Sequence, residues 1–325
     1  MLGVSIYVFY ELISECYISM NILVTGGAGF IGSHLCEHLV SIGHNLTVLD
    51  DLSSGHKRNL ESVLNVIDFY EEKIEFFNFN KLSNIDSVVH LAAQVSVPVS
   101  IDNFGSSSMS NLSGTIKVID FCRRYRLPLV YASSSAVYGN LDFGDDVESS
   151  VDLLSPYATD KYVMELYTKV AYQRYDLSSI GLRFFNVYGP RQDPSSAYSG
   201  VISIFCDRLL KDKNITIKGG FQTRDFIYVK DVVDAIYKSL TIAHQNILCE
   251  HINVLTGKSI SVEQVADMLI DKVGANGEKI YADLPPGDPK KSYGATMKME
   301  RVLGTDLDAM VSISAGLSST VEYIR

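Results

Sequence analysis

Two side chains that could move a proton stand four residues apart in the segment YATDK. They are Tyr157 and Lys161, within a helical pattern at residues 157–175. Four residues is about one helical turn, so both side chains are expected on one face. A neighbouring ammonium favours the phenolate and lowers the tyrosine pKa from about 10, which would make Tyr157 a general base. The alternative is an amphipathic helix that carries this pair by chance.

A run of hydroxyl side chains supplies a second candidate group. Ser133, Ser134 and Ser135 follow the apolar residues 129–131. If that run is a strand, the hydroxyls lie just beyond its carboxyl end, where open α/β sheets bind ligands. One hydroxyl can then share a proton between a substrate and Tyr157. The alternative is a serine turn that caps a helix.

The glycine-rich segment TGGAGFIG, residues 25–32, predicts a dinucleotide site. It follows the apolar residues 21–24 and opens a helical pattern at residues 33–40. Glycines permit the tight turn, the approach of the backbone to a pyrophosphate and close packing of helix on strand, while the helix N-terminus faces the phosphates. The loop residues expected at the cofactor are Gly26, Gly29, Phe30, Ile31 and Gly32. The next predicted strand, residues 46–50, ends in Asp50, which can accept both ribose hydroxyls and would repel a 2′-phosphate. We therefore expect NAD.

Apolar runs alternate with helical patterns along the chain. Strands are expected at residues 22–24, 47–49, 74–77, 87–91, 129–131 and 179–184, with helices at 115–125 and 157–175. This order predicts an α/β fold, a Rossmann-type doubly wound parallel sheet in residues 20–185. After Asn186 a turn-rich stretch precedes expected helices at 202–211, 231–243 and 262–273 and a strand at 215–218. We interpret residues 186–325 mainly as a smaller substrate domain.

Composition restricts the partners. The chain has 325 residues, 46% of them hydrophobic, and a formal net charge of -10. It has no basic run, which argues against nucleic acid or an anionic membrane as partner. Five scattered cysteines without metal-ligand spacing fit reduced thiols in the cytoplasm. Residues 1–19 are interpreted as a leader outside the natural fold, with Met20 as the start; a short extra helix is the alternative.

Other polar groups are interpreted as structural. His34 and His38 have metal-ligand spacing, but the sequence shows no third ligand, so no metal site is expected. His90 ends a predicted strand and is expected to pack. The acidic run is interpreted as a solvated loop; its members are Asp142, Asp145, Asp146 and Glu148.

Eight segments, in order and spacing, resemble the extended short-chain dehydrogenase/reductase family, and within it the UDP-galactose and UDP-N-acetylglucosamine 4-epimerases. They are residues 25–32, 50–51, 90–94, 111–115, 133–139, 157–161, 183–186 and 224–229. The resemblance covers Met20 to the C-terminus. It implies bound NAD, a UDP-sugar substrate, and a homodimer formed through the helices near residues 115–125 and 157–175.

The resemblance also implies individual roles. The catalytic positions are Ser134, Tyr157 and Lys161. The cofactor positions beyond the glycine loop are Asp50, Asp51, Asn78, Leu91, Ala92, Ala93, Asn111, Tyr157, Lys161 and Phe184. The substrate positions are Ser96, Ser134, Asn186, Gln192, Gly200, Arg224 and Ser292. Asn78 replaces an adenine-contacting Asp of the family.

Two positions narrow the expected reaction. Ser135 and Ala136 stand where the family's dehydratases and decarboxylases carry acids, and elimination of water needs such groups. What is left is oxidation at C4, rotation of the 4-keto sugar and reduction on the other face. Small residues at Gly200 and Ser292 favour N-acetylated sugars.

Pro285 stands where the family holds the diphosphate with Arg, and an arginine is not replaced equivalently by lysine. Because of this departure, UDP-uronic acid 4-epimerase stays an alternative function. A nucleotide-sugar oxidoreductase and a binding protein on the same fold also stay open.

Overall fold

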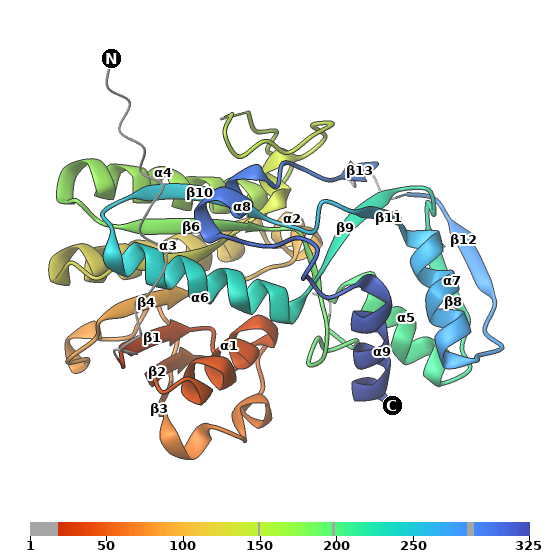
Figure 1. Cartoon of the computed structure of the whole chain (residues 1–325), viewed down its shortest axis with the longest axis horizontal. Coiled ribbons are helices and arrows are strands. Elements are labelled where there is room, and N and C mark those ends of the chain that lie inside the picture. The colour runs from red at the N-terminus through yellow and green to blue at the C-terminus, as the bar shows by residue number, and fades with distance from the viewer. Residues whose placement is uncertain (1–18, 149, 197–198, 285–288) are drawn as a thin grey trace.

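The computed structural model describes residues 19–148, 150–196, 199–284 and 289–325. A seven-stranded sheet with helices on both faces forms the larger part, and a smaller C-terminal part lies beside one end of it (Figure 1). Every strand pair in the large sheet is parallel. In spatial order the strands are β3 (Asp68–Glu71), β2 (Asn45–Asp50), β1 (Asn21–Thr25), β4 (Ser87–His90), β5 (Leu129–Ser134), β6 (Ser179–Phe184) and β10 (Cys249–Val254).

The strand order reverses between β1 and β4. This is the switch point at which open parallel sheets form a crevice for a ligand. Strands β1, β4, β5 and β6 are almost wholly buried, as expected for a sheet covered on both faces. Ser134 ends β5, and Thr25 ends β1, so both lie at the carboxyl edge of the sheet.

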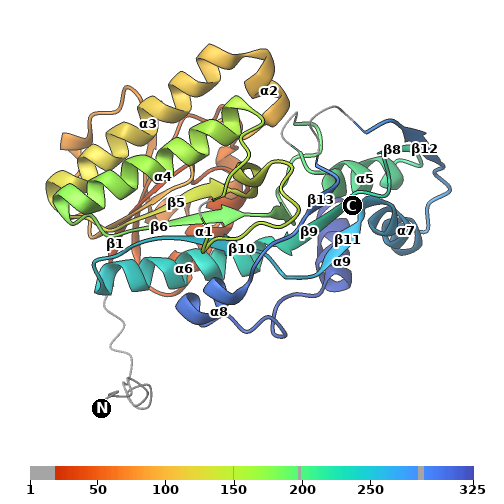
Figure 2. The same ribbon diagram turned by 90° about the horizontal axis from the view of Figure 1, so that it is seen from above.

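Helices cover the sheet in two layers, which Figure 2 shows from above. One face carries α1 (Phe30–Ser41), α6 (Val229–Gln245) and α8 (Met297–Leu303); the other carries α2 (Val97–Asp102), α3 (Phe104–Tyr125) and α4 (Pro156–Tyr175). Helix α4 begins where Ser155 accepts a hydrogen bond from the Ala158 amide at 3.1 Å and Pro156 takes the first position. It ends at Asp176, which adopts the left-handed conformation.

The C-terminal part contains short strands and helices. Its strands are β7 (Asn186–Tyr188), β8 (Ile215–Lys218), β9 (Thr223–Tyr228), β11 (Ser259–Ser261), β12 (Lys279–Ala282) and β13 (Lys291–Ser292). Its helices are α5 (Val201–Leu210), α7 (Val262–Val273) and α9 (Ile313–Ile324). Helices α5, α7 and α9 pack around a separate hydrophobic core. Elsewhere, short 3-10 turns connect the larger elements: η1 (Lys57–Leu60), η2 (Leu64–Val66), η3 (Phe79–Lys81) and η4 (Ser135–Tyr138).

The Rossmann-type parallel sheet expected from the sequence is confirmed. The strand expected at residues 74–77 is wrong: these residues form a turn, and the edge strand is β3, just before them. Ile74 and Phe77 are buried as anchors in the core under α3, while Phe76 between them is exposed. The apolar residues 74–77 therefore reflect the packing of a turn against the core and not a strand.

Residues beyond Asn186 contribute to both parts of the molecule. β10 pairs with β6, and α6 packs on β5 and β6, so the large sheet needs segments from the C-terminal half. The expected boundary near residue 186 stays a prediction. Pro285 and nearly all of the expected leader lie outside the described residues. Within the described ranges, no helix is long and apolar enough to span a membrane.

Candidate active site

The glycine loop leaves β1 and turns into α1 without room for side chains. Gly26 has φ +74°, and a Cβ on it would lie 2.7 Å from the Ala92 amide nitrogen. A Cβ on Gly32 would lie 2.1 Å from the Gly26 carbonyl oxygen. The loop therefore exposes backbone beside the first turn of α1, which is the cradle that a pyrophosphate requires.

Asp50 holds this cradle in shape. Its carboxylate accepts hydrogen bonds from the amides of Ala28 (2.9 Å) and Leu52 (2.8 Å). Burial raises its pKa, and the two amides counteract that effect. Each carboxylate oxygen keeps a further lone pair, so Asp50 can still accept a ribose hydroxyl. The loop and Asp50 together fit a dinucleotide such as NAD.

One cavity, with a volume of about 1510 Å³, runs along the carboxyl edge of the sheet. It brings together most of the sequence-predicted residues. On the cofactor side these are Gly26, Gly29, Phe30, Ile31, Gly32, Asp50, Asp51, Leu91, Ala92, Ala93 and Phe184; the others are Ser134, Tyr157, Lys161, Asn186, Gln192, Gly200, Arg224 and Ser292. The volume exceeds the ~300–1,000 Å³ of an ordinary small-ligand pocket. It suits two nucleotides bound at once.

Three sequence-predicted residues are missing from the described lining of this cavity. Asn78 is exposed and caps η3 by accepting from the Asn80 amide at 3.1 Å. Ser96 caps α2 by accepting from Val99, so its neighbours Val95 and Val97 face the cavity instead. Asn111 is buried behind the wall. The Asn78 and Ser96 side chains cap helical turns, and that of Asn111 bonds Asp160. A sequence motif does not reveal such contacts.

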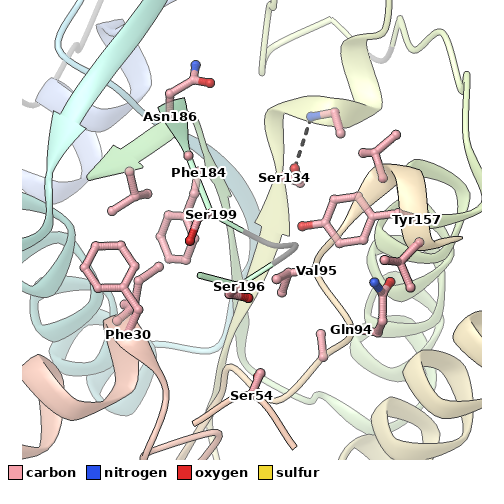
Figure 3. A pocket seen from close by; sticks show the side chains of 18 of the residues that line it. Phe30, Ser54, Gln94, Val95, Ser134, Tyr157, Phe184, Asn186, Ser196 and Ser199 are labelled. Atoms are coloured by element: carbon pink, nitrogen blue, oxygen red, sulfur yellow. Dashed lines mark hydrogen bonds between the residues drawn. The ribbon is translucent and has the colours of Figure 1, made fainter. Parts of the chain in front are cut away.

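Ser134, Tyr157 and Lys161 come together from β5 and α4. Figure 3 shows the Tyr157 hydroxyl pointing toward Ser134. The Ser134 hydroxyl accepts from the Ala136 amide at 3.1 Å, and Figure 3 draws this bond. Lys161 Nζ lies 5.8 Å from the centre of the Tyr157 ring and donates to the Ala132 carbonyl at 2.7 Å. The arrangement can pass a proton between a bound hydroxyl, Ser134 and Tyr157.

Burial determines the charge of these groups. It raises the pKa of Tyr157; Ser134 lowers that pKa and Asp160 raises it further. Burial also lowers the pKa of Lys161 to about 8, while Asp160 raises it. The expectation that Lys161 brings the tyrosine pKa below its usual value is therefore not met in this structure. Desolvation of the phenolate is the larger effect.

A buried polar network supports β5 from the side away from the cavity. Arg183 donates to both oxygens of Glu165, at 2.9 and 2.6 Å, and to the Tyr138 hydroxyl at 2.8 Å. Ser133 donates to Glu165 at 2.6 Å. Glu165 and Arg183 form an ion pair, and Arg183 holds the pKa of Glu165 below its usual value although burial raises it. The network fixes Ser133, next to Ser134.

The network reaches the acidic run, where the sequence interpretation was partly wrong. Tyr138 donates to Asn253 at 2.6 Å, and Asp146 accepts from the Asn253 amide at 2.8 Å. Asp146 is buried, not solvated. His90 is packed as expected, bonded to Thr25 at 2.7 Å and Thr115 at 3.0 Å.

The C-terminal part supplies the other wall of the cavity. Asn186 donates to the Asp225 carbonyl at 3.1 Å, and Ser292 pairs with Arg224 in the register of β13 and β9. A Cβ on Gly200 would lie 3.3 Å from Gln192 Nε2. Figure 3 shows Asn186 and Phe184 across the pocket from Tyr157. This wall combines polar side chains with aromatic ones such as Phe226 and Tyr293.

Sequence reasoning missed Arg191. It lines the cavity, forms an ion pair with Glu37 of α1 at 2.6 Å, and its Nη1 atom is buried with no hydrogen-bond partner among the described residues. His34, four residues before His38, bonds the Pro190 carbonyl at 2.9 Å. The turn-rich stretch that follows Tyr188 was the available signal. An orphan guanidinium nitrogen on this wall fits an anionic ligand.

The fold and the site define a nucleotide-binding enzyme of the extended short-chain dehydrogenase/reductase type. The family model described as "NAD dependent epimerase/dehydratase family" matches residues 22–254, and the chain belongs to that family. It is thus an NAD-dependent enzyme of the epimerase type.

Individual relatives agree with this assignment. A putative UDP-glucose 4-epimerase of Methanocaldococcus jannaschii is 38% identical, over 94% of this chain and 98% of the relative. The Thermotoga maritima UDP-glucose 4-epimerase solved with UDP-glucose is 35% identical, with a TM-score of 0.86, covering 94% and 98% of the two chains. The Methanobrevibacter ruminantium UDP-N-acetylglucosamine 4-epimerase solved with UDP-N-acetylmuramic acid is 33% identical, with a TM-score of 0.86 and the same coverage.

Proposed function

We propose that this protein is a UDP-hexose 4-epimerase that acts on UDP-GlcNAc, UDP-glucose or both. The observation that carries the proposal is one cavity shared by the glycine loop, by Ser134, Tyr157 and Lys161, and by the polar wall of the C-terminal part. An epimerase must hold a dinucleotide and a nucleotide sugar together with a proton-transfer group. The named activities of the relatives support the same assignment.

Tyr157 is the proton-transfer group in this proposal. Its phenolate takes the proton of the C4 hydroxyl, Ser134 hydrogen-bonds the same oxygen, and the tyrosine later returns the proton to the inverted hydroxyl. Bound NAD supplies the hydride acceptor and donor for C4. Because burial raises the pKa of Tyr157, the phenolate needs a positive charge beside it, and Lys161 is the cation that lies there.

Ser135 and Ala136 support a reaction without elimination. Both line the cavity in η4, directly after Ser134. Neither side chain can serve as the acid or base that loss of water from the sugar would need. The 4-keto sugar is therefore reduced again after it rotates.

The substrate wall favours an N-acetylated sugar. Ser292 lines the cavity with a small side chain, whereas Gln192 already fills the space beside Gly200. An acetamido group therefore has space to turn when the sugar rotates. We infer that UDP-GlcNAc and UDP-GalNAc are accepted alongside or ahead of UDP-glucose and UDP-galactose.

We also propose that two copies pair through α3 and α4. These helices pack against each other and present apolar side chains on the outside of the molecule. Ile116, Leu166, Tyr167 and Val170 are each between 42% and 53% exposed. Large apolar side chains exposed on two packed helices are typical of a subunit interface.

The decisive experiment combines nucleotide identification with a substrate panel. The purified protein is denatured, the released nucleotide is identified by chromatography, and UDP-glucose, UDP-galactose, UDP-GlcNAc and UDP-glucuronate are assayed in parallel. We expect released NAD, conversion between C4 epimers, and no net NADH. Tyr157→Phe is expected to lower kcat by about 10²–10⁴-fold with the fold unchanged.

Three other results would contradict the proposal. Accumulation of NADH would indicate a net oxidoreductase. Conversion of UDP-glucuronate alone would indicate a uronic-acid epimerase. Binding of the nucleotide sugar without turnover, equal in the parent and in Tyr157→Phe, would indicate a binding protein.

A further inference from the structure

A buried carboxylate stands directly before the catalytic lysine, and the proposed reaction does not use it. Asp160 is 2% exposed and Lys161 is 1% exposed, both in the first turns of α4. A carboxylate taken out of water is costly unless it is hydrogen-bonded and its charge is balanced. Asn111 supplies a hydrogen bond to Asp160, and Lys161, next to it in the chain and equally buried, carries a charge of opposite sign.

The hydrogen bond comes from Asn111 of α3. Asn111 Nδ2 donates to Asp160 Oδ2 at 3.1 Å and to the Gln94 carbonyl at 3.2 Å, and its Oδ1 accepts from the Gln94 amide at 2.8 Å. Gln94 lines the cavity, on the same side as Tyr157 in Figure 3. Asn111 therefore joins the catalytic helix to a segment of the cavity wall.

Few other charged groups lie around Asp160 and Lys161. From β5, the Ala132 carbonyl accepts from Lys161; from β4, burial lowers the pKa of His90 to about 3, so this ring is neutral. On α3 the nearby side chains, Asn111 and Thr115, do not titrate. Asp160 raises the pKa of both Lys161 and Tyr157. Among the described residues no other charged side chain acts on Lys161 to that extent.

We propose that Asp160 is a positioning residue for the reaction: its carboxylate balances the Lys161 ammonium, and its bond to Asn111 ties the catalytic helix to the Gln94 wall. The catalytic part of this inference rests on the proposed epimerase function. Asp160 does not touch the substrate. It acts through Lys161, Tyr157 and Asn111.

The test removes the charge of Asp160 and keeps the shape of its side chain. Asp160→Asn can still accept the hydrogen bond of Asn111 through its amide oxygen. Without the charge, the pKa of Lys161 falls, so the ammonium is lost at lower pH; the pKa of Tyr157 also falls, so the phenolate forms at lower pH. The acidic and alkaline limbs of the kcat profile are both expected to move to lower pH, by roughly 1 unit.

A second readout does not depend on turnover. The Cε signals of ¹³C-labelled lysines are followed by NMR as a function of pH, and the Lys161 signal is assigned with a Lys161→Met variant. We expect the Lys161 titration to move to lower pH in Asp160→Asn. Asp176→Asn, the same change at the exposed end of α4, should alter neither the titration nor the kcat profile.

The outcomes separate this inference from the proposed function. A purely structural Asp160 would lower kcat while the limbs and the Lys161 titration stayed in place, and that result would overturn the inference. A parent protein without epimerase activity, but with a Lys161 titration that moves in Asp160→Asn, would overturn the proposed function and support the charge balance. If Asp160→Asn does not fold, Asp160→Ser carries the same expectations.

Discussion

At Tyr157, the residue type and its spacing from Lys161 indicate the chemistry but not the charge state. The ring is buried, and desolvation raises its pKa more than the Ser134 hydroxyl lowers it. Lys161 is buried as well, and its own pKa drops to about 8. A tyrosine base therefore depends on positive charge that stays in the site, and this makes the groups around Lys161 part of the function.

Ser292 is the residue at which substrate choice can be tested. Ser292→Tyr places a ring on the substrate wall, so the acetamido group of a rotating sugar loses its space. We expect UDP-GlcNAc turnover to fall by roughly 10–100-fold relative to UDP-glucose turnover. The measurement is kcat/KM for both sugars. Ser319→Tyr, at an exposed position of α9, is the matched control. An unchanged ratio of the two kcat/KM values in Ser292→Tyr would refute the inference that the space at Ser292 selects the sugar.

Among the elements, β5, β6 and α4 work as one unit. Glu165 of α4 and Arg183 of β6 form the buried ion pair, and Ser133 of β5 bonds to the same carboxylate. Because Ser133 adjoins Ser134, the ion pair fixes the end of the strand that carries the Ser134 hydroxyl. Tyr138 extends the contact to β10 through Asn253.

Removing one partner of this pair should destabilise the protein strongly. Arg183→Met leaves the Glu165 carboxylate buried without compensation, so we expect a loss of about 3–5 kcal/mol in the free energy of unfolding. Denaturant unfolding measures it. The double variant Glu165→Gln with Arg183→Met should lose less than Arg183→Met alone. A loss below about 1 kcal/mol in Arg183→Met would contradict the role assigned to the pair.

The same pair has a defined pH dependence. Arg183 holds the pKa of Glu165 below its unfolded value of about 4.3. The stabilisation is therefore complete above that pH and is lost as the pH falls through the lower folded value. The stability gap between the parent and the double variant should narrow in acid.

For the whole molecule, the cavity depends on segments far apart in sequence. The large sheet provides the glycine loop and the β5 edge, and the C-terminal part provides Asn186, Arg224 and Ser292. The Arg191–Glu37 pair links the two sides across α1. Helices α3 and α4 lie on the far face of the sheet from α1 and α6, which leaves their outer surface available to a second copy (Figure 2).

The proposed dimer contact through α3 and α4 can be tested with a single added charge. Leu166→Glu puts a charge on the apolar face of α3 and α4, so we expect the dimer to dissociate. Sedimentation velocity measures the oligomeric state of the parent and of each variant. Ile280→Glu, on β12 of the C-terminal part and 48% exposed, should leave the dimer intact. A parent that sediments as a monomer, or a Leu166→Glu variant that stays dimeric, would contradict the proposed interface.

Features that depend on local geometry were predictable from the order of the residues alone. The glycine loop, Asp50 and the Tyr157/Lys161 spacing predicted a dinucleotide site and a proton-transfer group, because turns and helical faces follow from nearby residues. Most strands of the large sheet were predictable for the same reason. The turn at Ile74 was not, because its apolar side chains serve packing against α3.

Features that depend on contacts between distant segments could be seen only in the folded chain. Asn111 has a suitable residue type for ligand contact, yet it bonds Asp160, which is 49 residues away in the chain. Asp146 looks solvated in sequence but is buried against Asn253. The charge of Tyr157 and the role of Asp160 follow from burial, which is set by the packing of α3, α4 and the sheet and not by any short stretch of the chain.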